Sequence, residues 1–367
     1  LTAVNAWGYT LEQSYETERF PTEGDGLRLT IDANIQHYLE NALGYAVKEH
    51  HVAARAVGIV MDVNTGGIVA MASYPNYDPG DFSTIYTEGL QAELDAALAE
   101  IQQNRSTYET EEAYNQALAN ARATIQFKQW RNKCYQDTYE PGSTFKPITL
   151  ATALEEGVVD ENSTFDCPGY YMVNGMRINC SKVQGHGHQT LAEAVQNSCN
   201  PAFMMIGQRL GAEKFYDYFE AFGMTEVTGI DLPGEEKGQD WGREYFTSLE
   251  GYLSLATASF GQRFTVTPLQ MITAFSAVIN GGNLYQPYVV QSITDASGAV
   301  LQNTEPTLTR QVVSQESSDR ARAILESVVS EGTGGNAYQA GYRIGGKTGS
   351  SETDEEGRTI VSFMGFA

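Results

Sequence analysis

The spacing of hydrophobic positions predicts a helix followed by a hairpin near the start of the chain. Asp32 is a residue type that favours helix N-termini, and apolar residues recur after it at helical spacing. These residues are Ile35, Tyr38, Leu39, Leu43 and Val47. Two short apolar runs, 56–63 and 68–73, are separated by the turn sequence Asn64-Thr65-Gly66-Gly67. We therefore expect an antiparallel hairpin here.

Residues 83–128 differ in character from their surroundings. They are rich in Ala, Glu and Gln, and leucines four positions apart indicate helix. We expect two helices with a break near residues 104–110. Such a segment either forms an arm that contacts a partner or packs on the domain as a helical insertion, and we favour the insertion.

The remainder of the chain predicts further helices and a second hairpin. The predicted helices cover residues 190–196, 265–280 and 318–330, and the predicted strands cover 342–348 and 359–364 around a turn at 355–357. Gly281-Gly282 ends the second of these helices. The order indicates an α+β fold, with an antiparallel sheet built from hairpins at both ends of the chain and helices between them.

Composition narrows the class of protein. The chain has 367 residues, 41% hydrophobic content, 36 glycines and a net charge of −23. This acidity argues against binding to nucleic acid or anionic lipid. No run of 18 apolar residues occurs, so no membrane span is expected within the sequence. The absence of an initial Met suggests a piece of a longer protein, with residues 1–26 the tail of a preceding domain.

The chain has four cysteines, Cys134, Cys167, Cys180 and Cys199. Asn174-Gly175 is a strong hairpin turn signal between Cys167 and Cys180, so the hairpin would bring these two together. A disulfide and two free thiols are equally compatible with this arrangement. Cys134 and Cys199 are expected to be packing residues.

Metal binding is not predicted from sequence. The cysteines and histidines lack zinc-ligand spacing. His186 and His188 are close in sequence, but no third ligand is evident beside them, so we interpret their segment as a loop. No metal and no cofactor is expected.

Three short motifs, in order along the chain, predict a serine acyl-transfer site. They are Ser143-Thr144-Phe145-Lys146, Ser198-Cys199-Asn200 and Lys347-Thr348-Gly349. Ser143 and Lys146 share one helical face, and burial would lower the pKa of Lys146 so that its neutral amine takes the serine proton. Gly349 would allow close backbone approach.

Each motif has a purely structural explanation. Ser143 could be a helix cap beside a surface lysine, Ser198 and Asn200 could be polar caps at a helix end, and Lys347 could guard a sheet edge. These explanations treat the motifs separately. The occurrence of all three in this order favours the catalytic interpretation.

The chain resembles the class B penicillin-binding proteins, the monofunctional peptidoglycan transpeptidases. The likeness runs from about residue 26 to the end, outside the helical insertion. The segments that carry it are Thr138-Tyr139-Glu140-Pro141-Gly142-Ser143-Thr144-Phe145-Lys146-Pro147, Leu29-Thr30-Ile31-Asp32 with Ile35-Gln36, Ala256-Thr257-Ala258-Ser259-Phe260-Gly261-Gln262 with Thr267-Pro268-Leu269-Gln270, and Gly345-Gly346-Lys347-Thr348-Gly349-Ser350.

The resemblance implies the penicillin-binding fold with a mostly helical second lobe, residues 27–367 forming a transpeptidase domain. It implies that Ser143 is the nucleophile acylated by the D-Ala-D-Ala end of a stem peptide or by β-lactams. By position, Lys146 would be the base and Ser198 a proton relay. Asn200, Lys347, Thr348, Gly349 and Ser350 would bind the substrate, and the N–H groups of Ser143 and Ser350 would form the oxyanion hole.

The resemblance also implies a setting. The domain would lie on the extracytoplasmic face of the cell membrane behind an N-terminal anchor, and would serve cell-wall synthesis in division, elongation or sporulation with a membrane glycosyltransferase as partner. The alternatives are a D,D-carboxypeptidase or β-lactamase-type hydrolase, or a β-lactam sensor. No counterpart of the deacylating glutamate of β-lactamases is found. Family chains continue past Ala367 into a further sheet strand, so the C-terminal end is expected to be truncated.

Overall fold

The computed structural model describes residues 24–52, 55–353 and 357–367, which fall into two compact units. The smaller unit is a three-stranded antiparallel sheet in the order β1-β9-β10. Its strands are β1 (Gly26–Leu29), β9 (Val290–Thr294) and β10 (Val300–Asn303). Most of the predicted N-terminal tail lies outside the described residues.

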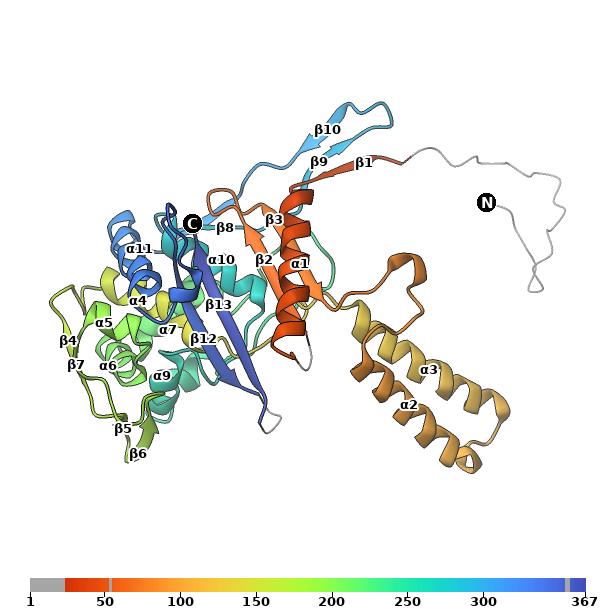
Figure 1. Cartoon of the computed structure of the whole chain (residues 1–367), viewed down its shortest axis with the longest axis horizontal. Coiled ribbons are helices and arrows are strands. Elements are labelled where there is room, and N and C mark those ends of the chain that lie inside the picture. The colour runs from red at the N-terminus through yellow and green to blue at the C-terminus, as the bar shows by residue number, and fades with distance from the viewer. Residues whose placement is uncertain (1–23, 53–54, 354–356) are drawn as a thin grey trace. The chain divides into compact units, whose positions relative to one another are not determined.

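The larger unit begins with the predicted helix and hairpin. Helix α1 (Ala33–Glu49) starts at Asp32, whose carboxylate accepts the backbone N–H groups of Asn34 and Ile35. Strands β2 (Ala56–Met61) and β3 (Ile68–Tyr74) pair antiparallel, and α1 packs on β3 (Figure 1). The first predicted elements are therefore confirmed.

Two helices occupy the predicted insertion, α2 (Glu88–Gln103) and α3 (Glu111–Trp130), joined by the short η2 (Arg105–Thr107) after η1 (Pro79–Asp81). Their buried side chains, Leu90, Leu94 and Ile125, form a hydrophobic cluster separate from the two other clusters of the unit. The expectation that the insertion packs on the domain is therefore wrong in one respect, because the pair mainly buries its apolar faces against each other.

The central elements form a mostly helical region. It contains η3 (Gly142–Phe145), α4 (Lys146–Glu155), β4 (Thr164–Cys167), β5 (Tyr170–Val173), β6 (Met176–Asn179), β7 (Gly187–Thr190), α5 (Leu191–Gln196), α6 (Asn200–Leu210), α7 (Ala212–Ala221), α8 (Arg243–Phe246), α9 (Tyr252–Ala258) and α10 (Pro268–Ile279). Strand β4 pairs with β7, and β5 pairs with β6 through the predicted Asn174-Gly175 turn. Both turn residues have positive φ, as this hairpin type requires.

The C-terminal elements complete the unit. They are β8 (Asn283–Tyr285), β11 (Leu308–Gln311), α11 (Gln315–Ser330), η4 (Gly335–Ala337), β12 (Gly345–Glu352) and β13 (Thr359–Phe366). Helix α11 starts three residues earlier than predicted because Ser314 accepts the Ser317 N–H. Strand β12 starts at Gly345, later than predicted, because Tyr342 is held in a turn by Gln339.

The two terminal hairpins were expected to share one sheet. Within the described residues, β2-β3 and β12-β13 are instead separate two-stranded sheets with no hydrogen bonds between them. The α+β class is confirmed, and the two hairpins are unpaired, as expected without the further strand that the resemblance implies between them.

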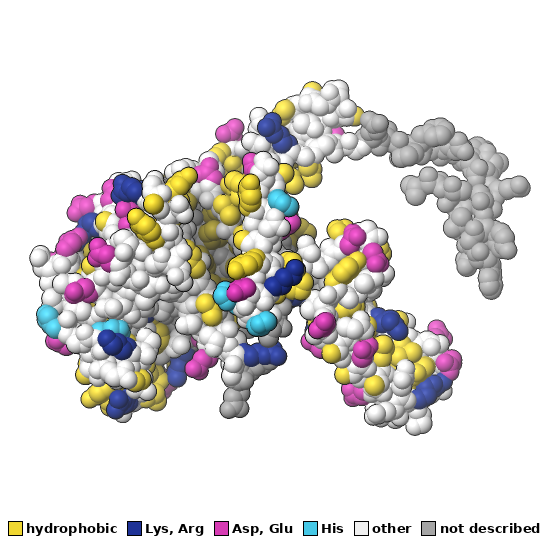
Figure 2. All heavy atoms as spheres, in the orientation of Figure 1, with side chains coloured by type: hydrophobic (Ala, Val, Ile, Leu, Met, Phe, Trp, Pro, Cys, Tyr) yellow, Lys and Arg dark blue, Asp and Glu magenta, His cyan; other side chains and the backbone are white. Residues whose placement is uncertain are grey.

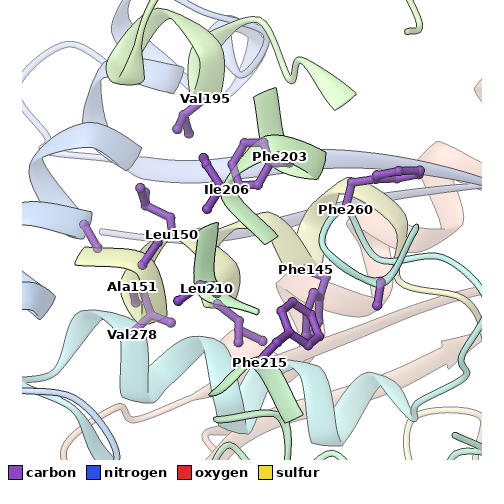
Figure 3. Packing of buried hydrophobic residues seen from close by; sticks show 14 of the residues in the cluster. Phe145, Leu150, Ala151, Val195, Phe203, Ile206, Leu210, Phe215, Phe260 and Val278 are labelled. Carbon is purple, nitrogen blue, oxygen red and sulfur yellow. The ribbon is translucent and has the colours of Figure 1, made fainter. Parts of the chain in front are cut away.

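The main hydrophobic core lies among the helices (Figure 3). Phe145 follows Ser143 into this core, where its ring meets Phe264 edge-on at 4.9 Å. Leu150 of α4, Phe203 and Ile206 of α6 and Val278 of α10 fill the same interior. The segment that carries Ser143 is thereby anchored by a buried aromatic side chain.

All four cysteines are free thiols in the described structure, and all four are buried. Cys167 and Cys180 are therefore not joined by a disulfide.

Candidate active site

Ser143 lies on the tight turn η3 that leads into α4. Gly142 adopts φ +54°, and a side chain there would place its Cβ 2.7 Å from the Ser350 carbonyl oxygen. The Gly142 N–H donates to the Gly261 carbonyl at 2.8 Å. Only glycine suits this conformation and this close approach. The turn therefore presents Ser143, half-buried, at the start of a helix.

Lys146 is fully buried at the first position of α4. Its Nζ donates to the Ser198 carbonyl at 2.7 Å, to Ser198 Oγ at 3.0 Å and to Asn200 Oδ1 at 2.8 Å. Burial, followed by the nearby charge of Lys347, lowers the pKa of Lys146 well below its ordinary value. Burial thus favours the neutral form of this amine, the form that can accept a proton.

Ser198 lies in the turn between α5 and α6, and Asn200 is the first residue of α6. Ser198 has φ +53°, an uncommon conformation for a residue with a side chain. The turn is held by the hydrogen bonds from Ser198 N to Val195 O and from Cys199 N to Ala194 O. The capping box of Thr190 and Glu193 fixes the start of α5. Local hydrogen bonds therefore hold Ser198 in the turn that places it beside Lys146.

Strand β12 brings the third motif to the turn that carries Ser143. A Cβ on Gly349 would lie 3.1 Å from the Thr144 backbone nitrogen and 2.9 Å from its Cγ2, so the strand lies directly against η3. Ser351 Oγ donates to the Glu140 carbonyl at 2.8 Å and stabilises the contact between β12 and the segment before η3. Gly349 therefore leaves room for the backbone of Thr144 beside β12.

Lys347 is completely buried in β12, and its Nζ donates to the Thr348 carbonyl at 3.0 Å. Burial lowers the pKa of Lys347 to about 7. Thr348 is half-buried and its hydroxyl hydrogen-bonds the Thr333 hydroxyl at 3.2 Å, whereas Ser350 is exposed. The surface-guard explanation of Lys347 is wrong, because its side chain has no solvent exposure.

The three motifs therefore meet in one region. Lys146 contacts the second motif directly, and Gly349 and Ser350 of the third motif contact the turn that carries Ser143. Lys146 directs its hydrogen bonds to Ser198 and Asn200 rather than to the Ser143 hydroxyl.

Two supporting positions were not predicted from sequence. Gly261 approaches so closely that a Cβ there would lie 1.9 Å from the Gly142 carbonyl oxygen, and Glu140 accepts the Arg263 N–H at 2.9 Å. The family-like segments around these residues were the only available signal. Their roles depend on contacts between positions more than 100 residues apart.

Comparison with known proteins agrees with this geometry. Residues 56–367 match the family described as penicillin binding protein transpeptidase domain. The chain belongs to this family. The resemblance to class B penicillin-binding proteins is thereby confirmed.

Individual relatives support the assignment. The chain is 38% identical over 354 residues to "Stage V sporulation protein D" of Bacillus subtilis, covering 95% of this chain and 48% of the relative. It is 26% identical to penicillin-binding protein PbpB of Mycolicibacterium smegmatis, covering 94% and 47%. The chain thus spans about half the length of these curated relatives.

Solved structures show the same fold. The D,D-transpeptidase domain of a peptidoglycan glycosyltransferase from Eggerthella lenta superimposes with a TM-score of 0.73 at 29% identity, covering 93% of this chain and 75% of that one. Among the described residues, none of the helices has the length and apolar character needed to cross a membrane.

Proposed function

We propose that this chain is the catalytic domain of a peptidoglycan D,D-transpeptidase that works through a Ser143 acyl-enzyme. The observation that carries the proposal is the buried Lys146 amine, which hydrogen-bonds Ser198 and Asn200 while the Ser143 turn packs against the strand of Lys347. Family membership gives independent support.

In the proposed first step, neutral Lys146 accepts the Ser143 proton as the serine oxygen attacks the carbonyl of the penultimate D-Ala. The C–N bond to the terminal D-Ala breaks, and the leaving amine receives its proton through Ser198. The acyl group remains on Ser143 as an ester. An amine of a neighbouring stem peptide then attacks the ester, its proton returns through the same groups, and Ser143 is regenerated.

The remaining motif residues would bind the substrate. Asn200 would hold the peptide amide, and Lys347, Thr348 and Ser350 the terminal carboxylate. Gly349 would allow the strand to pack against the nucleophile turn. The N–H groups of Ser143 and Ser350 would stabilise the oxyanion. A bound carboxylate would favour the charged form of Lys347, whose pKa burial lowers to about 7.

β-Lactams would acylate the same serine, which gives a direct experiment. The intact mass of the chain is measured after incubation with benzylpenicillin, beside Ser143→Ala and the exposed-site control Ser248→Ala. We expect a stable one-to-one mass gain in the native chain and the control, and none in Ser143→Ala. A gain that persists in Ser143→Ala would overturn the assignment of the nucleophile.

Turnover separates the transpeptidase from the alternatives. A hydrolase would continue to consume a chromogenic cephalosporin, whereas the proposed enzyme gives a single stoichiometric burst. A β-lactam sensor would be acylated but would fail to join a peptide donor to an amine acceptor. Product formation with such a donor and acceptor, monitored by mass, is the result expected here.

The setting of the domain is part of the proposal. We place it on the extracytoplasmic face of the cell membrane, anchored by a segment preceding residue 1, and assign residues 1–26 to a preceding domain. Residues 26–29 fall outside the larger unit, in one sheet with β9 and β10. The proposed partner is a membrane glycosyltransferase, in division, elongation or sporulation.

A further inference from the structure

The loop that follows α11, residues 331–334, lies between the second and third motifs. The Thr333 N–H donates to the Gln196 carbonyl at 3.2 Å, and the Thr333 and Thr348 hydroxyl oxygens are hydrogen-bonded at 3.2 Å. Gln196 ends α5, two residues before Ser198, and Thr348 belongs to β12. Thr333 therefore connects the two motifs, one through its backbone and the other through its side chain.

Two glycines determine the path of this loop. A Cβ on Gly332 would lie 2.9 Å from the Gln196 Cβ and 3.0 Å from the Gln196 carbonyl oxygen, so the loop lies in backbone contact with the end of α5. The N–H groups of Gly332 and Gly334 both donate to the Val328 carbonyl, at 3.1 Å and 3.0 Å. The backbone of Thr333 is thereby held by α11 and by α5.

Packing does not explain the threonine side chain at this position. Thr333 is exposed, so its methyl group contributes little to the core. Its backbone hydrogen bond to Gln196 could be made by any residue type except proline. Among the contacts described for this part of the chain, the interaction that requires a hydroxyl at residue 333 is the hydrogen bond to Thr348. The choice of threonine is therefore linked to Thr348.

The direction of the Thr348 hydroxyl matters for the role proposed for it. A hydroxyl rotates freely unless a hydrogen bond fixes it, and a carboxylate accepts only donors. When Thr348 donates to a bound carboxylate, the Thr333 hydroxyl can turn and donate to Thr348 Oγ1. Each hydrogen bond in such a chain strengthens the next. Only the hydroxyl hydrogens rotate in this step, and no proton is transferred.

We propose that Thr333 is a positioning residue that orients the Thr348 hydroxyl toward the carboxylate of a stem peptide or a β-lactam. The inference rests on the proposed function, because it takes Thr348 as a residue that binds this carboxylate. Thr333 acts through Thr348 and needs no contact of its own with the ligand.

A purely structural role for the loop leads to a different expectation. If Thr333 served only to join α11 to α5, its N–H group would do so in every variant other than proline. Removal of the hydroxyl would then leave the recognition of carboxylates unchanged. Substitution of the side chain therefore isolates the proposed role.

The test compares acylation of Ser143 by benzylpenicillin and by its methyl ester, which lacks the carboxylate charge. In Thr333→Val, the benzylpenicillin concentration that gives half the maximal acylation rate should rise about 3–10-fold, the effect of one lost hydrogen bond. The maximal rate constant should stay unchanged, because the lost contact serves binding. The ester should react equally with both proteins, and Thr333→Ser should restore the native concentration dependence.

Further variants complete the comparison. Thr124→Val, an exposed threonine whose hydroxyl bonds the Asn120 carbonyl within α3, should keep native kinetics. In a Thr348→Val background, Thr333→Val should have no further effect, because the group through which it acts is absent. The melting temperature of Thr333→Val should stay close to the native value, because the side chain is exposed. Thr333→Ala repeats the test without a branched side chain.

Three results would overturn the proposal: native kinetics in Thr333→Val and Thr333→Ala, equal losses with the acid and the ester, or effects of Thr333→Val and Thr348→Val that add. Failure of the proposed function is recognised separately, since the native chain would then not be acylated at Ser143. That result would overturn the role of Thr333 as well.

Discussion

At the scale of single residues, the two lysines of the motifs are the least ordinary features of the chain. Both Lys146 and Lys347 are fully buried, which is rare for lysine without a paired carboxylate. Their Nζ atoms are bonded to neutral oxygens of Ser198, Asn200 and Thr348. Burial therefore lowers both pKa values, and this is the physical basis of the roles proposed for them.

Replacing Lys146 tests its role as base. Lys146→Met should lower the rate of Ser143 acylation by benzylpenicillin by about 10²–10⁴-fold, the usual contribution of a general base. The measurement is the time course of the mass gain. Lys128→Met, an exposed lysine on α3, should acylate at the native rate. Native kinetics in Lys146→Met would exclude proton transfer to this amine.

The pH dependence of stability tests Lys347. Its pKa is about 7 in the folded chain, against 10.5 for an ordinary lysine such as the unfolded chain presents to water. Between these values the unfolded chain holds more protons, so the free energy of unfolding rises with pH, by at most about 1.4 kcal/mol per pH unit for one proton. Below pH 7 Lys347 is protonated in both the folded and the unfolded chain. The folded chain then bears the full free-energy cost of burying this charge.

Urea unfolding of the native chain and Lys347→Met at several values between pH 6.5 and 8 measures this effect. The native chain should gain stability relative to Lys347→Met as the pH rises. A stability difference independent of pH would show that Lys347 titrates normally.

At the scale of elements, the site depends on glycines at the places where separate segments come into backbone contact. Gly142 and Gly349 let η3 and β12 lie in backbone contact, and Gly261 brings the end of α9 to the same turn. These contacts place the third motif against Ser143 even though some 200 residues separate them in sequence. The geometry of the Ser143 turn therefore depends on how η3, β12 and the segment after α9 pack against one another.

A pair of glycine variants distinguishes the effect of a positive φ from the effect of a steric clash with a neighbouring residue. Gly142 and Gly157 both have positive φ, +54° and +64°, but only Gly142 has a neighbour that an added Cβ would strike. Gly157→Ala should cost about 1–2 kcal/mol of stability and retain acylation. Gly142→Ala should cost more and should lose most of its acylation rate, because the nucleophile turn must move away from Ser350.

Thermal unfolding and the benzylpenicillin time course, measured on both variants, give the comparison. Equal acylation in the two would mean that contact with Ser350 does not position Ser143.

At the scale of the whole molecule, the buried hydrophobic side chains among the described residues fall into three clusters. The largest surrounds α4 and α6, a second contains Ile68 and Leu269, and the third belongs to α2 and α3 alone. Acidic side chains are scattered over the face in Figure 2 and do not form one patch. Substitutions in the third cluster should therefore leave the geometry of the proposed active site unchanged.

Leucine truncation tests that independence. Leu94→Ala should loosen α2 and α3, where loss of a buried leucine costs about 2–5 kcal/mol, while the acylation rate stays at the native value. Leu150→Ala, in the main core beneath Ser143, should lower both the melting temperature and the acylation rate. Limited proteolysis locates the loosened segment. A fall in acylation with Leu94→Ala would show coupling between the clusters.

Much of the molecule was determined by its sequence alone. Helical spacing, capping residues such as Asp32 and Thr190, and the Asn174-Gly175 turn predicted the helices α1, α2, α3, α5, α10 and α11 and three hairpins, because these signals act within a few residues of the chain. The three motifs also identified the candidate site, since their residue types and order are chemically specific.

Contacts between segments that are remote in sequence were decided by the tertiary structure alone. It separated the two terminal hairpins into different sheets and gave α2 and α3 a cluster of their own. It also gathered Cys167, Cys180, His186 and Cys199 around one point, although their spacing resembles no zinc motif. Burial and contact between remote segments are set by packing, and the pKa values of Lys146 and Lys347 follow from that burial.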